Sequence, residues 1–163
     1  MIPHYQLLSE RLRTELRHLA RVVESAESAL AKARRQPQDQ DEFIAAAALD
    51  LHSFYAGLEH LFEQIAVDVD HKHPAGSSWH SDQLLQMTLP MRGARPVVLS
   101  SESREALTEY LDFRHLVRNV YTFNLRPERV AELVRGLRSA FGMAQRDLLA
   151  FADFLDGLST ADE

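Results

Sequence analysis

The sequence predicts an all-α fold, an up-and-down bundle of about five helices of which four are long and one is short. Apolar residues recur at spacings of three and four through most of the chain, which is the pattern of helices with one buried face. Proline, glycine and short polar stretches interrupt this pattern, and neither strand alternation nor an internal repeat is visible. We therefore expect a single helical domain over residues 1–157, followed by a frayed tail over 158–163.

Two long helices are predicted in the first half of the chain. Leucines, valines and alanines recur at helical spacing over about 5–35, and the polar stretch Gln36–Asp41 ends that helix. The second helix, over about 41–69, has an unusually wide apolar face. We expect it to lie centrally and to contact more than one neighbour or a second subunit.

The second half is more often interrupted. A loop is predicted over 70–82, a short helix over 82–91 and an extended connector over 92–99. Ser100 or Ser101 can cap a fourth helix that begins at about residue 102. Pro127 suits the first position of a fifth helix, because its missing amide hydrogen would be unpaired there anyway.

Composition indicates a soluble globular protein. The chain has 163 residues, 45% hydrophobic and 26% charged, which suffices for one domain with a real core. It contains no cysteine, which excludes disulfides and thiolate metal sites and is compatible with a reducing compartment. No stretch has the uninterrupted apolar character of a signal peptide or a membrane span, so we expect a cytoplasmic protein with no membrane association.

Charge is unevenly distributed. The net charge of −6 argues against a surface that grips duplex nucleic acid by bulk electrostatics. Between Arg104 and Arg146, however, eight arginines face five acidic residues. A small anion could be held there although the whole molecule is acidic.

The most informative stretch is LDFRHLVRNVYTFNL, residues 111–125. It places five polar side chains within eight residues: Arg114, His115, Arg118, Asn119 and Tyr121. Two guanidinium groups, an imidazole, a carboxamide and a phenol can position a phosphodiester, stabilise charge on its oxygens and stack on or hydrogen-bond to a base. A helix built only for packing has no need of them.

The segment from Arg114 to Tyr121 resembles the Arg-x(4–6)-His motif, with a tyrosine two residues beyond the histidine, of the HEPN superfamily and in particular of the HepT-like ribonuclease toxins. The similarity extends over about 46–134, through AALDLHSFYAGLEHLFEQIAVDVD, PAGSSWHSDQLLQM and RPERVAELV. Arg114 matches the motif arginine and Tyr121 the motif tyrosine, while Asn119 occupies the position of the histidine.

The resemblance implies a helical homodimer whose two motifs face a shared cleft, where single-stranded RNA is cut without a metal or other cofactor. It implies that Arg114 stabilises charge on the phosphate. It also implies a partner, a minimal nucleotidyltransferase antitoxin that silences the toxin by transferring AMP to Tyr121.

Asn119 changes the expected chemistry, because a carboxamide can orient a group but cannot act as a general base. The absence of an imidazole at this position could lower the rate of RNA cleavage by about 10²–10⁴-fold. Three alternatives remain open: His115 shares a helix face with residue 119, His52 or His80 folds into the cleft, or the arginines alone give a slow enzyme. Positions 114 and 119 diverge by about 140° on a regular helix, so the helix bends or ends nearby, or the two groups serve different subunits.

Each candidate also has a structural alternative. Arg114 and Arg118 could be solvated or form salt bridges to Asp112 or Glu59, Tyr121 could be a core phenol, and Asn119 could be a helix cap. His52, Tyr55 and Glu59 fall on one side of the second helix, where satisfied interior polar groups are favoured over a supporting role in the cleft.

The remaining histidines and the tryptophan point less clearly to a function. His71, His73 and His80 do not have the spacing of a zinc site, so no metal is expected. Trp79 is favoured as an anchor for its loop over a platform for base stacking.

The polar cluster and the resemblance together imply a toxin with endoribonuclease activity. A binding module that has lost catalysis but still engages a nucleotidyltransferase, RNA or a nucleotide is the alternative, and a purely structural dimer is a third.

Overall fold

The computed structural model describes residues 3–119 and 125–161, and the side chains of residues 3, 4, 118 and 119 are outside this description. All regular elements in the described part are helices, so the predicted all-α bundle is confirmed. They are α1 (Pro3–Arg35), the 3₁₀ helix η1 (Pro37–Asp39), α2 (Gln40–Asp68), α3 (Trp79–Met87), α4 (Ser101–Asn119) and α5 (Pro127–Ala161). None of these helices is long and apolar enough to span a membrane.

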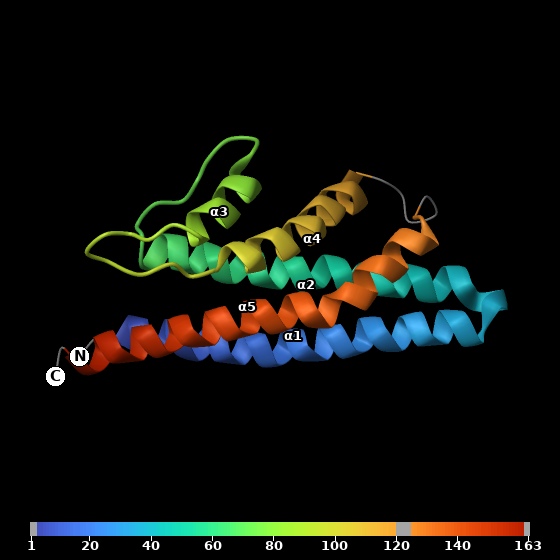
Figure 1. Cartoon of the computed structure of the whole chain (residues 1–163), viewed down its shortest axis with the longest axis horizontal. Coiled ribbons are helices and arrows are strands. Elements are labelled where there is room, and N and C mark those ends of the chain that lie inside the picture. Colours follow the sequence, from blue (N-terminus) through green and yellow to red (C-terminus); the bar gives the residue numbers. More distant parts are fainter. Residues whose placement is uncertain (1–2, 120–124, 162–163) are drawn as a thin grey trace.

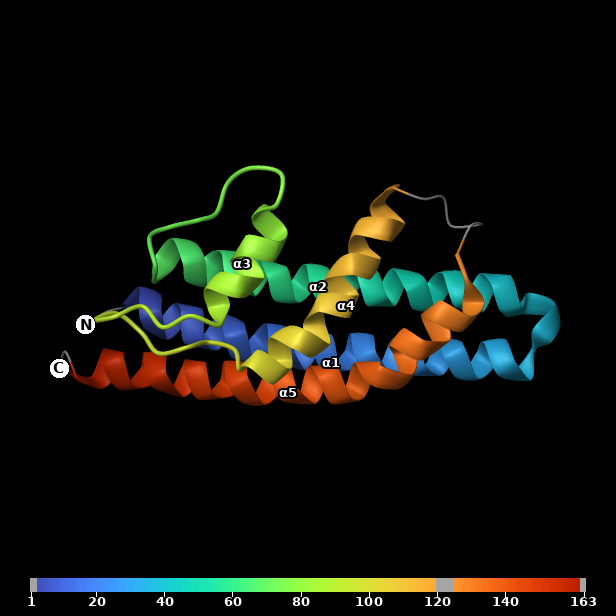
Figure 2. The same ribbon diagram turned by 45° about the horizontal axis from the view of Figure 1, so that its top comes forward.

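Helices α1, α2 and α5 run along the long axis of the molecule, and α3 and α4 lie together on one side of α2 (Figures 1 and 2). Helix α2 contacts α1, α3, α4 and α5, which confirms the prediction that the helix with the widest apolar face lies centrally. Its buried residues include Leu51, Phe54, Leu58, Phe62 and Ile65. Burial of such side chains stabilises the fold by about 1.5–3 kcal/mol each.

One glycine allows α1 and α2 to approach closely. A Cβ atom on Gly57 would lie 2.8 Å from Cδ2 of Leu19 and 2.9 Å from Oε1 of Glu15. Glycine costs about 1 kcal/mol relative to alanine inside a helix, but here a larger residue would require the side chains of Leu19 and Glu15 to shift.

Tyr110 fixes the middle of α4. Its ring packs edge-on against Phe54 of α2, with centroids 5.5 Å apart, and its buried hydroxyl donates a hydrogen bond of 2.7 Å to the carbonyl of Leu133 in α5. Burial raises the pKa of this phenol. The segment of α4 that follows, which carries Arg114, is therefore held against both α2 and α5.

Ser100 caps the start of α4, as one of the two predicted candidates. Its Oγ accepts a hydrogen bond of 3.1 Å from the amide of Ser103, and Asp147 of α5 accepts from the amide and hydroxyl of Ser100 and from the hydroxyl of Ser103. Burial raises the pKa of Asp147, but hydrogen bonds from Ser103 and Ser100 outweigh it, and the net shift is downward.

Three element boundaries differ from the predictions. Helix α3 begins at Trp79 rather than at residue 82, because its first turn is already closed by the amide of Asp82 bonding to the carbonyl of Ser78. It ends at Met87, since Pro90 lacks an amide hydrogen and restricts the residue before it. Helix α5 continues past Gly157 to Ala161, where the hydroxyl of Ser159 bonds back to the carbonyl of Leu155.

The connector over 92–99 was predicted to be extended. The structure instead begins it with a tight turn. Met91 and Arg95 form an isolated antiparallel bridge, and the amides of Ala94 and Arg95 bond to the carbonyl of Met91. Gly93 supplies the positive φ of 78° that the turn requires.

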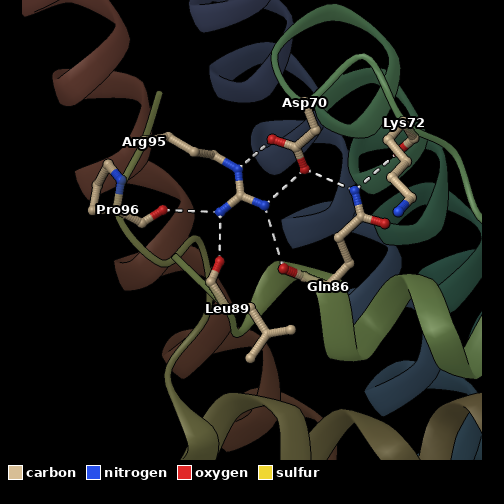
Figure 3. Close-up of polar contacts among 6 residues, drawn as sticks. All are labelled: Asp70, Lys72, Gln86, Leu89, Arg95 and Pro96. Carbon is tan, nitrogen blue, oxygen red and sulfur yellow. Dashed lines mark hydrogen bonds and ion pairs between the residues drawn. The ribbon is translucent and has the colours of Figure 1, made fainter. Parts of the chain in front are cut away.

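This turn places Arg95 inside the protein (Figure 3). Its guanidinium forms a two-point ion pair with Asp70, at 2.6 and 2.7 Å, and both side chains are 0% exposed. The other N–H groups donate to the carbonyls of Leu89, Pro96 and Gln86, so all five guanidinium donors are satisfied. Arg95 thereby links the end of α2 to the end of α3.

Candidate functional site

A buried carboxylate lies where α2, α3 and α4 meet. Glu59 of α2 is 3% exposed, and its Oε2 lies 2.6 Å from Nδ1 of His80 in α3. Its Oε1 accepts a hydrogen bond from Nη1 of Arg114 in α4. One carboxylate thus joins an imidazole and a guanidinium from two other helices.

Aromatic rings extend this group in two directions. His80 stacks on Trp79 with centroids 3.6 Å apart, and His73 lies against the same indole at 5.1 Å. On the other side, His115 meets His80 edge-to-face at 5.1 Å. The indole is occupied by protein side chains, an arrangement that fits the anchoring alternative for Trp79 better than base stacking.

His115 is half-buried and has a lowered pKa. Burial is the main cause, and the neighbouring His80 and Arg114 lower it further, while Glu59 opposes the shift. These surroundings favour the neutral form of the ring.

Tyr55 lies one turn before Glu59 on α2 and is fully buried. Burial and the charge of Glu59 raise the pKa of its phenol. Its hydroxyl and Nε of Arg114 are buried without a hydrogen-bond partner among the described residues. Buried polar atoms of this kind normally have a hydrogen-bond partner.

The structure brings together five of the residues singled out from the sequence: Tyr55, Glu59, His80, Arg114 and His115. Arg114 takes the salt-bridged arrangement with Glu59 that was the structural alternative. His52 is half-buried on α2, seven residues before Glu59. Arg118 and Asn119 end α4 with side chains outside the description, and Tyr121 lies outside the described residues.

Sequence reasoning missed Gln83. It is fully buried on α3, and its Nε2 lies 3.3 Å from Nε2 of His73. Its place three residues after His80 would have been a signal only if α3 had been predicted to begin at Trp79. Within the described residues, no three His, Asp or Glu side chains are grouped so that they could hold a metal ion.

The fold and the site define a class: an all-helical domain with an arginine, a carboxylate and two histidines at a three-helix junction. The chain belongs to the HepT-like protein family of the HEPN superfamily, whose model matches residues 46–155 and so includes every residue of this site. A comparison with curated proteins found no match. A comparison with solved structures found none either.

Proposed function

We propose that this protein is the toxin of a toxin–antitoxin pair and acts as a metal-independent endoribonuclease on single-stranded RNA. The observation that carries the proposal is the placement of Arg114 beside two histidines, His80 and His115, in a member of the HepT-like family. A guanidinium can hold a phosphodiester and stabilise charge that develops on it, while an imidazole can move a proton near neutral pH.

In the proposed reaction, Arg114 and Arg118 bind the phosphate while the adjacent 2′-hydroxyl attacks phosphorus in line. A histidine takes the hydroxyl proton, and Asn119 orients the attacking or leaving oxygen. The bond to the 5′-oxygen breaks, that oxygen gains a proton, and a 2′,3′-cyclic phosphate remains. We propose that two copies of the chain form the cleft, and that a minimal nucleotidyltransferase is the antitoxin.

Asn119 at the motif position favours a second candidate, a binding module without catalysis, and one experiment separates the two. Wild-type protein and Asn119→His are incubated with single-stranded RNA in EDTA, and products are tested for cyclic phosphate ends. The toxin hypothesis predicts cleavage by the wild type, with a gain in the variant of at most about 10²–10⁴-fold. An inert wild type with an active Asn119→His variant would identify the binding module.

Transfer of AMP to Tyr121 is a separate prediction. The added phosphate and nucleoside would put negative charge and bulk among the arginines that RNA needs. Co-expression with a neighbouring nucleotidyltransferase should raise the mass of the peptide containing Tyr121 by one AMP unit or more, whereas the same peptide from Tyr121→Phe should not change. An unmodified Tyr121 beside an active transferase would contradict it.

A further inference from the structure

Glu59 uses its two oxygens for two different partners. Oε1 binds Arg114, and Oε2 binds His80 at 2.6 Å. The side chain of Glu59 is 4% exposed, that of Arg114 17% and that of His80 8%. Water therefore competes little for these contacts. Removing the carboxylate would release both partners at once.

The contacts also determine which nitrogen of His80 carries the proton. An ionised carboxylate only accepts hydrogen bonds, and a guanidinium only donates them. Nδ1 lies 2.6 Å from Oε2 of Glu59 and 3.3 Å from Nη1 of Arg114. If Nδ1 carried a lone pair, that lone pair would face and repel the carboxylate oxygen at the shorter of the two distances. If Nδ1 carries the proton, it donates a strong hydrogen bond to that oxygen. Neutral His80 is therefore protonated on Nδ1, which leaves the lone pair of the ring on Nε2.

We propose that Glu59 is a positioning residue that orients Arg114 and fixes this tautomer of His80, and that Nε2 of His80 accepts the proton of the attacking 2′-hydroxyl. This inference rests on the proposed ribonuclease function and decides between the histidines that the sequence left open. The O–H bond breaks toward Nε2 as the oxygen attacks phosphorus. The leaving 5′-oxygen takes a proton from water, and Nε2 returns its proton to water afterwards.

The neighbouring charges favour His80 over His115 for this role. A general base becomes positively charged when it takes a proton. At His80 that charge arises 2.6 Å from the carboxylate of Glu59, which offsets the guanidinium of Arg114 3.3 Å away. At His115 burial lowers the pKa most, His80 and Arg114 lower it further, and the charge of Glu59 opposes the shift without reversing it.

The test combines spectroscopy with kinetics. Nitrogen-15 spectra of the histidine rings should show the Nδ1–H tautomer for His80 in the wild type, with the signal assigned by its loss in His80→Gln. Glu59→Gln keeps the size of the side chain. Its amide oxygen can accept from Arg114, so its NH₂ group faces Nδ1 and shifts His80 to the Nε2–H tautomer. We expect kcat for RNA cleavage to fall by about 10²–10⁴-fold in His80→Gln and in Glu59→Gln.

The pH dependence and two controls distinguish this role from a structural one. In His115→Gln, cleavage should still decline at low pH as the imidazole base takes up a proton. In His80→Gln, the residual cleavage should not show this decline, because that base is absent. His60→Gln, on the exposed face of α2, and Glu63→Gln, one turn after Glu59, serve as matched controls that should cleave as the wild type does.

The possible outcomes are separable. An Nε2–H tautomer of His80 in the wild type, or undiminished cleavage by His80→Gln, would overturn the inference even if Glu59→Gln failed to fold. A wild type that shows the Nδ1–H tautomer and the shift in Glu59→Gln but never cleaves RNA would overturn the proposed function and the role of Nε2 as base. It would leave the positioning by Glu59 supported.

Discussion

Arg114→Ala is expected to lower RNA cleavage by about 10²–10³-fold, the loss typical of removing one group that stabilises charge in a transition state. The guanidinium of Arg114 has five N–H donors, and its Nη1 contact with Glu59 leaves others for a phosphate oxygen. The measurement is kcat and KM on single-stranded RNA in EDTA. Cleavage by Arg114→Ala at the wild-type rate would exclude Arg114 from the reaction and with it the proposed mechanism.

The same variant also affects folding, so a second substitution is needed. Arg114→Ala leaves Glu59 buried without its cationic partner, which can cost about 3–5 kcal/mol of unfolding free energy. Arg114→Lys keeps a charge near Glu59 but lacks the planar fork, so it should be more stable than Arg114→Ala and still strongly impaired in cleavage. Arg104→Ala is the matched control, since Arg104 is exposed on the same helix.

The helices could be predicted because their signals are local. Apolar spacing located α1, α2, α4 and α5 to within a few residues, and Ser100 and Pro127 marked helix starts by their own chemistry. The start of α3 could not be located in this way. The sequence predicted that the helix follows His80 or Ser81, whereas the observed start brings Trp79 and His80 into the helix, where they stack.

The composition of the site was largely predictable, but its connections were not. The alternative in which Arg114 binds Glu59 could be stated from charge alone, and it is observed. The contact between Glu59 and His80 spans a loop that follows α2, and its existence depends on where that loop places α3. Nothing local to His80 specifies this, because α3 is held by tertiary contacts such as those of Arg95.

Arg95→Ala is expected to lower the free energy of unfolding by about 3–5 kcal/mol, because it leaves Asp70 buried without its cationic partner. The carbonyls of Leu89 and Gln86 would lose a donor as well. Urea denaturation followed by circular dichroism measures the change. Arg92→Ala, an exposed arginine in the same turn, should change stability by no more than about 0.5 kcal/mol.

The double variant Asp70→Leu/Arg95→Met separates two possible roles of the ion pair: raising the free energy of unfolding, and fixing how the end of α3 is aligned with the end of α2. Apolar residues of similar volume often replace a buried ion pair at little cost, so the double variant should be more stable than Arg95→Ala. Because Arg95 ties the end of α3 to the end of α2, losing its directed contacts should also loosen the alignment of His80 with Glu59. We therefore expect the double variant to recover stability but not the Nδ1–H signal of His80. A stability loss below about 1 kcal/mol in Arg95→Ala would contradict the structural role of the pair.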